Sequence, residues 1–225
     1  HEVTLRDAHA EGGILKRVEA HVVDYSITMV EEDSGRRVEC TLAELKHELQ
    51  GEVDVDRYFA RKRLRFHDVY LESLLGPAIA RFQSKRAQHR GATRGGEAVR
   101  GHQMLVICMS NRHAAEVLAF IERRYGWLAA TRIGQDVPEA ERAERLEAYR
   151  QGDVDIMVQV DMIGEGTDIK TISVIAKLDL VSARSKCLQQ IFRGMRYYAP
   201  WPDEANVCDV FASGDLGLSD TLDWI

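Results

Sequence analysis

The sequence predicts an α/β fold, with a parallel sheet and helices on both of its faces. The main observation is that short apolar runs alternate with amphipathic stretches from residue 101 onward, which is the pattern of consecutive β-α units. A second observation is a less regular first part with one hairpin pattern. We therefore expect a smaller α+β connector region at 1–100, followed by the α/β domain at 101–225.

The connector region is expected to hold one β-hairpin and a helical part. Residues 21–30 alternate apolar and polar side chains, a turn follows, and residues 37–41 resume the strand pattern. Residues 69–88 have a helical pattern. Gly76 and Pro77 lie within it, and we expect them to kink this helix or split it in two.

In the second region, strands and helices are expected to alternate along the chain. Strands are predicted at residues 104–109, 128–133, 156–160, 173–178 and 206–211. Helices are predicted between them at 112–125, 138–149 and 185–193, the second with a proline in its first turn. The first of these helices is expected to bury Ala115, Leu118, Ala119 and Phe120.

A glycine-containing loop follows the apolar strand at 156–160. Gly164 and Gly166 permit positive φ angles, and loops after parallel strands are where α/β sheets bind ligands. The backbone N–H groups of this loop and the Asp168 carboxylate are therefore candidates for contact with a nucleotide or a phosphate chain. An ordinary turn after a strand explains the same two glycines equally well.

Gln189, Arg193 and Arg196 follow a spacing of four and then three residues. On a helix this spacing places all three side chains on one face. Two guanidinium groups on one face predict a clamp for a polyphosphate, because arginine stays charged and presents a rigid fork of donors. The alternative is a solvated helix face that carries two arginines.

Together these segments resemble motifs V and VI of the superfamily-two helicases and translocases, which are nucleic-acid-dependent ATPases with two RecA-like domains. Gln189, Arg193 and Arg196 match motif VI in type and spacing, and residues 164–169 look like the Glu-Gly-x-Asp form of motif V in restriction-type and excision-repair-type members. Residues 104–112 are similar to motif IV, so the resemblance covers roughly residues 102–212.

The chain departs from the family pattern at two places. Val160 lies near the position where many members have a threonine that contacts the nucleic-acid backbone. Phe192 lies where a glycine usually precedes the first arginine of motif VI, and Gly194 follows that arginine instead. The second departure concerns local packing more than the arginine spacing.

The resemblance implies that the α/β domain is the second RecA-like domain of such a motor. Neither a Gly-x-x-x-x-Gly-Lys-[Ser/Thr] phosphate loop nor an Asp-Glu-x-His or Asp-Glu-Ala-Asp motif occurs in the sequence. ATP and Mg²⁺ are therefore expected to bind mainly to a first RecA-like domain of the same polypeptide, and the chain alone is expected not to hydrolyse ATP.

The resemblance also assigns expected roles to three groups of residues. Arg193 and Arg196 are expected to reach the β and γ phosphates, with Arg196 as the arginine finger, and Gln189 to orient hydrogen bonds in the cleft. The nucleotide-binding group is expected to include Gly164, Glu165, Gly166 and Asp168. Phosphates of the nucleic-acid strand are expected to contact Ser110, Asn111 and Arg112.

Composition is compatible with these expectations without proving them. The formal net charge is −6, which by itself does not indicate a nucleic-acid partner. Ten lysines and arginines lie between residues 61 and 100 against three acidic residues, and a basic stripe favours binding to a nucleic acid. We expect this nucleic acid to be DNA; the charge pattern does not distinguish DNA from RNA. The alternative is a solvated helix followed by a basic linker.

Several classes of protein are not favoured by the sequence. The four cysteines are scattered and the eight histidines lack metal-binding spacing, so no metal centre is expected. The longest apolar runs are far shorter than the roughly 20 residues of a membrane span. No signal peptide is expected, and we expect a cytoplasmic location. The competing hypothesis is a non-catalytic RecA-like interaction module in a nucleic-acid-processing complex.

Overall fold

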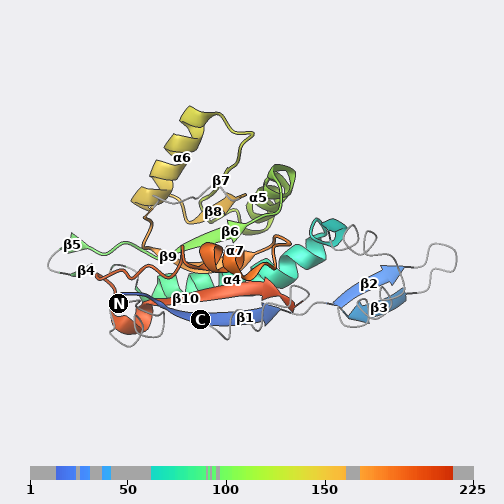
Figure 1. The fold of residues 1–225 in the computed structure, drawn as a ribbon, viewed down its shortest axis with the longest axis horizontal. Coiled ribbons are helices and arrows are strands. Elements are labelled where there is room, and N and C mark those ends of the chain that lie inside the picture. Colours follow the sequence, from blue (N-terminus) through green and yellow to red (C-terminus); the bar gives the residue numbers. More distant parts are fainter. Residues whose placement is uncertain are drawn as a thin grey trace.

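A six-stranded sheet forms the centre of the computed structural model, which describes residues 14–23, 26–30, 37–41, 62–89, 91, 93–94, 97–160 and 168–214. All neighbouring strands pair in parallel, in the order β1-β10-β9-β6-β8-β7 (Figure 1). Their bounds are β1 Arg17–Val23, β6 Gln103–Ile107, β7 Ala130–Ile133, β8 Ile156–Gln159, β9 Ile172–Lys177 and β10 Val207–Ser213.

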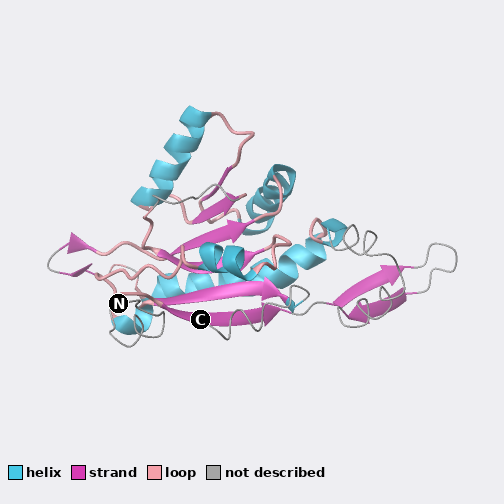
Figure 2. Ribbon diagram, viewed as in Figure 1, coloured by secondary structure: helices cyan, strands magenta, loops and turns pink. Residues whose placement is uncertain are grey.

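Helices cover both faces of this sheet, as Figure 2 shows by colour. Side chains alternate across each strand, so Met104 and Val106 of β6 join one hydrophobic cluster while Leu105 and Ile107 join the other. The first cluster is covered by α4 (Asp68–Gln88) and α5 (Asn111–Tyr125), and the second by α6 (Glu139–Gln151) and α7 (Arg184–Ile191). The predicted α/β class with a parallel sheet and helices on both faces is thereby confirmed.

Two elements from the expected connector region at 1–100 are integral parts of the sheet and its core. Strand β1 pairs with β10 from Arg17↔Val207 to Val23↔Ser213. Helix α4 contributes Leu74, Leu75 and Ile79 to the first hydrophobic cluster, among other residues. The boundary expected near residue 100 therefore does not separate β1 and α4 from the packing of the α/β domain.

The predicted hairpin is present, although it begins later than expected. Strands β2 (Ser26–Val30) and β3 (Arg37–Thr41) pair antiparallel as a separate two-stranded sheet. The first three residues of the predicted hairpin strand, 21–23, belong to β1 instead. Shorter elements are β4 (Thr93–Arg94), β5 (Glu97–Ala98) and the 3-10 helix η2 (Asp203–Ala205). Within the described residues, no helix combines the length and apolarity that crossing a membrane requires.

Helix α4 runs without a break through Gly76 and Pro77, so the expected division of this helix is wrong. The reason is tertiary packing: Leu74, Leu75 and Ala78 on either side of the pair are almost completely buried against the sheet. Burial of this apolar face, at about 25 cal/mol per Å² of apolar area, outweighs the helix-breaking tendency of one proline.

The buried face of α5 differs from the predicted one. Ala115 and Ala119, which were expected to face inward, are exposed. Ser110 caps the helix, since its Oγ accepts a hydrogen bond from the His113 N–H at 3.2 Å, and this cap fixes where the helical repeat starts. The face that packs on the sheet then consists of His113, Ala114, Val117, Phe120 and Ile121.

Candidate functional site

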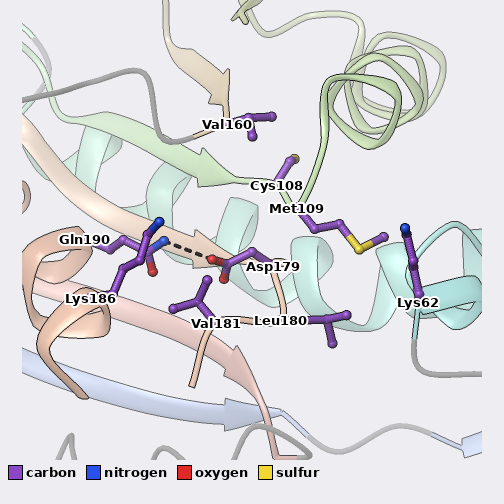
Figure 3. Close-up of a pocket in the computed structure, with 9 residues that line it drawn as sticks. All are labelled: Lys62, Cys108, Met109, Val160, Asp179, Leu180, Val181, Lys186 and Gln190. Atoms are coloured by element: carbon purple, nitrogen blue, oxygen red, sulfur yellow. Dashed lines mark hydrogen bonds between the residues drawn. The ribbon is translucent and has the colours of Figure 1, made fainter. Parts of the chain in front are cut away.

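The carboxyl ends of β8, β6 and β9 lie side by side and leave a pocket at that edge of the sheet (Figure 3). We call it the edge pocket; it has a volume of about 390 Å³. Apolar side chains form most of its wall, and Lys62 and Lys186 lie on opposite sides of it in Figure 3. Its lining consists of Lys62, Cys108, Met109, Val160, Asp179, Leu180, Val181, Lys186 and Gln190.

A buried polar cluster forms one part of the edge pocket. Asp179, which is 3% exposed, forms an ion pair through Oδ1 with the Lys177 ammonium group. Its other oxygen, Oδ2, accepts a hydrogen bond of 2.9 Å from Gln190 Nε2. A buried carboxylate is costly unless it is paired and hydrogen-bonded, and both oxygens of Asp179 meet this requirement. The motif spacing points to Gln189 and gives no role to its neighbour Gln190; the Gln189–Gln190 doublet is the signal for Gln190 in the sequence.

The three residues predicted to contact nucleic acid lie at the carboxyl end of β6, as expected from the sequence. Ser110 and Arg112 line a second depression of about 420 Å³, together with Lys62, Arg63 and Phe66. We call it the Phe66 pocket. The Arg112 guanidinium lies 5.6 Å from the centre of the Phe66 ring, a cation–π distance. The Ser110 hydroxyl is engaged in capping α5, and a contact of these residues with phosphate stays a prediction.

His113, in the first turn of α5, is a core residue. Its side chain is fully buried, and Nε2 donates a hydrogen bond of 2.9 Å to the Arg65 carbonyl. The Met109 N–H approaches Nδ1 at 3.4 Å. Burial lowers the pKa of His113 to about 4, so the ring is neutral at pH 7.

Asp168 and Arg196 meet in an ion pair with an N–O distance of 2.8 Å. This pair does not lie at the carboxyl edge of the sheet. Leu15, just before β1, forms an isolated bridge with Arg196, and Asp168 precedes β9 by a few residues. Both residues are therefore near the amino ends of strands, and a contact of the loop before Asp168 with a ligand stays a prediction. Gly164, Glu165 and Gly166 lie outside the described residues.

Gln189, Arg193 and Arg196 do not share one helix face, so that expectation is wrong. Helix α7 ends at Ile191, and Arg193 and Arg196 lie beyond it. Gln189 is exposed on the helix. The two arginines are partly buried in the following turn and bridge.

The turn after α7 approaches the sheet closely at Gly194. A Cβ atom at this position would lie 2.3 Å from Cys208 Sγ and 3.0 Å from Ile175 Cδ1. Only glycine fits there without movement of its neighbours. This contact accounts for the position of the glycine after Arg193, where the family pattern usually has one before the first arginine.

The basic stripe predicted at 61–100 is not a continuous cationic surface. Arg65 is fully buried and donates from Nε to the Leu178 carbonyl at 3.1 Å. Arg86 pairs with Asp155 at 2.5 Å. Lys85 is 5% exposed and forms an ion pair with the buried Asp209 of β10. Several of these cations therefore serve the core, which weakens the stripe as an argument for nucleic acid.

Glu19, His21 and Asp209 place three possible ligand atoms within 4.8 Å of one another. Two cations already neutralise this cluster, because Arg81 Nε contacts Asp209 Oδ1 at 2.8 Å and Lys85 pairs with the same carboxylate. Burial alone raises the pKa of Asp209, and Lys85, His21 and Arg81 together hold it below its usual value. We therefore interpret this cluster as a structural charge network.

Comparison with protein families finds one match: residues 90–198 fit the helicase conserved C-terminal domain. A 78-residue stretch is 33% identical to the ATP-dependent RNA helicase DeaD of Mycobacterium tuberculosis, covering 35% of this chain and 14% of that protein. A 103-residue stretch is 29% identical to UvrABC system protein B of Thermosynechococcus vestitus, covering 44% of this chain and 15% of that protein. The matches thus span about a seventh of each relative.

Solved structures with a similar fold include Mss116p DEAD-box helicase domain 2 bound to an RNA duplex. The likeness covers 64% of this chain and 51% of that chain, with 9% sequence identity and a TM-score of 0.46. The part of the chain that fits the family, residues 90–198, contains the sheet strands β6, β7, β8 and β9.

Proposed function

Because residues 90–198 belong to the helicase conserved C-terminal domain family, we propose that this chain is the second motor domain of an ATP-driven nucleic-acid helicase or translocase. The observation that best supports the proposal is the Asp168–Arg196 ion pair. It brings together one residue from each of the two motif-like segments, although 28 positions of chain and a whole strand and helix separate them. Both side chains keep substantial exposure, 50% for Asp168 and 42% for Arg196, so a nucleotide held by another domain can reach them.

In this proposal the residues of the chain supply charge and hydrogen bonds to a nucleotide bound across an interface. Mg·ATP, held mainly by the first RecA-like domain, supplies the phosphoryl group and the metal. Arg196 serves as the arginine finger, Arg193 assists at the β and γ phosphates, and Asp168 approaches the ribose or couples the two domains. Gln189 orients hydrogen bonds from its exposed position on α7. Gly164, Glu165 and Gly166 complete the nucleotide-facing loop.

The hydrogen-bond donors of this chain fit a nucleotide that is held mainly by another domain. Guanidinium groups suit a polyphosphate because they remain charged and form paired hydrogen bonds with phosphate oxygens. Neither a phosphate loop nor an acid-rich metal motif occurs in the sequence, which supports ATP and Mg²⁺ binding mainly to the first domain. We expect the 225-residue chain alone to be inactive as an ATPase.

The nucleic-acid strand is proposed to pass over the carboxyl edge of the sheet. Ser110, Asn111 and Arg112 lie at the end of β6, where the start of α5 presents the positive end of its dipole. The cations of the Phe66 pocket add positive charge to the same edge. DNA as the preferred strand and a cytoplasmic location are further parts of the proposal; the names of the relatives include both an RNA helicase and a UvrABC component.

The test is Arg196→Ala in the full-length protein that contains both RecA-like domains, with nucleic-acid-stimulated ATP hydrolysis as the readout. Loss of an arginine finger lowers kcat by about 10³-fold or more. Arg196→Lys should recover little, because an ammonium group lacks the paired donors. Arg124→Ala, which removes an exposed arginine in the last turn of α5, should leave ATP hydrolysis unchanged.

Unchanged stimulated hydrolysis in Arg196→Ala would refute the assignment of the finger. If full-length protein also binds nucleic acid but hydrolyses no ATP under any condition, the chain is better described as a non-catalytic RecA-like interaction module.

A further inference from the structure

The edge pocket contains a buried acceptor that the structure leaves without a hydrogen bond. Gln190 is 2% exposed, and its Oε1 atom accepts no hydrogen bond from the residues that the structure describes. The orientation of the amide is fixed, because its Nε2 must be the atom that donates to the Asp179 carboxylate at 2.9 Å. Buried acceptors are nearly always satisfied, so this atom is open to a donor other than the described residues, such as a group bound in the pocket.

The wall of the pocket indicates what carries that donor. Apart from its polar cluster, the pocket is lined by Met109, Val160, Leu180 and Val181, with the buried Cys108 beside them. Its volume of about 390 Å³ lies at the lower end of the roughly 300–1,000 Å³ of small-molecule pockets. A flat, largely apolar group with an N–H on its edge matches this combination, and every nucleobase has such an edge.

Two cations lie on opposite sides of the pocket, Lys62 before α4 and Lys186 on α7 (Figure 3). A single phosphate cannot lie between groups on opposite sides and also leave the centre open for a base. The two phosphates that flank one nucleotide in a strand can each approach one lysine, since phosphate contacts from lysine act as point charges.

We propose that the edge pocket binds one nucleobase turned out of a single nucleic-acid strand, with Gln190 Oε1 accepting a hydrogen bond from the base and Lys62 and Lys186 near its flanking phosphates. This inference rests on the proposed function, because it places the strand along the same carboxyl edge. It adds a contact to a base where the proposed function requires only contacts to phosphates. A free mononucleotide presents the same chemistry and is the other source to be distinguished.

The test measures binding of the 225-residue chain to fluorescent oligonucleotides of abasic deoxyribose phosphate. One oligonucleotide carries a single central thymidine, a second carries N3-methylthymidine at that place, and a third is wholly abasic. The thymidine should bind about tenfold more tightly than the other two, because the N3 methyl group removes the only N–H of this base and leaves Gln190 Oε1 unsatisfied. Thymidine 5′-monophosphate is titrated in parallel and should bind more weakly than the thymidine oligonucleotide.

A variant and a matched control locate the effect. Val181→Trp fills the pocket and should abolish the advantage of thymidine while leaving affinity for the abasic strand unchanged. Val69→Trp makes the same substitution at a residue that is 44% exposed on α4 and should leave all affinities unchanged. The comparison of the three oligonucleotides uses the natural chain, so it decides the question even if Val181→Trp fails to fold.

Equal affinity for the thymidine, N3-methylthymidine and abasic strands would overturn the base pocket and leave the proposed motor function intact. Mononucleotide binding as tight as that of the thymidine oligonucleotide would overturn the strand as the source of the base. Failure of all three oligonucleotides to bind would overturn the base pocket. It would also count against the proposal that a nucleic-acid strand passes over the carboxyl edge of the sheet. The ATPase test of Arg196 does not depend on this result.

Discussion

Gly194→Ala should destabilise the fold, because the added methyl group has no space. The new Cβ would lie 2.3 Å from Cys208 Sγ and 3.0 Å from Ile175 Cδ1. The sulfur is buried in β10, so it cannot move aside into solvent. Adding a methylene-sized group to a packed core costs typically about 1–3 kcal/mol. Replacing glycine by alanine also reduces the conformational entropy of the unfolded chain, which stabilises the fold by about 0.4–1 kcal/mol. We therefore expect the free energy of unfolding to fall by about 1–2 kcal/mol.

Urea unfolding followed by circular dichroism measures this loss, and a second substitution tests its cause. Cys208→Ala removes the sulfur that the new methyl group would meet. If the clash is the cause, the double variant should lose less stability than the two single variants added together, by about 0.5 kcal/mol or more. Gly101→Ala is the control, since a Cβ there meets nothing within 4 Å, and it should stay within about 0.5 kcal/mol of the natural chain. A Gly194→Ala variant as stable as Gly101→Ala would refute the reasoning.

Three further predictions concern buried titratable groups. Lys85→Met removes the ammonium that pairs with the buried Asp209 and should lower the free energy of unfolding by about 3 kcal/mol in urea; an unchanged midpoint contradicts it. Burial lowers the pKa of His102 to about 2. As pH falls below about 6.5, only the unfolded chain takes up a proton at this histidine, so the folded chain should lose stability. His102→Gln should reduce this loss. Burial lowers the pKa of Lys16 to about 7, so stability should rise between pH 7 and 10.5; Lys16→Met should flatten that rise, measured as urea midpoints against pH.

The strands of the sheet centre could be predicted from the sequence because they are buried on both faces. Strands β6, β8 and β9 each contain a short apolar run, and every residue in them is buried. Strand β1 gives no such signal: it lies at the edge of the sheet and its residues are exposed or half-buried. Its pairing with β10 is a long-range contact that local periodicity does not encode.

The candidate site could be predicted in part. The resemblance assigned Asp168 and Arg196 to one nucleotide site; the two residues form an ion pair, and their roles at a nucleotide stay predictions. Helical periodicity failed for Arg193 and Arg196, because α7 ends at Ile191 and the turn that follows packs closely on β9 and β10 at Gly194. Gln190 was missed because the adjacent Gln189 fits the motif spacing, and only burial distinguishes the two side chains.

The pairing of β1 with β10 also affects how this domain folds during its synthesis on the ribosome. His21 and Asp209, which contact each other across these two strands at 2.8 Å, are 188 positions apart in the chain. At about 5–20 residues per second of synthesis, β1 waits roughly 10–40 s for the strand that completes it. During this interval the backbone donors and acceptors of β1 can pair with strands of other chains. The first strand of the sheet to be synthesised is therefore the last to be paired. A chaperone that binds nascent chains would need to cover β1 for the whole interval.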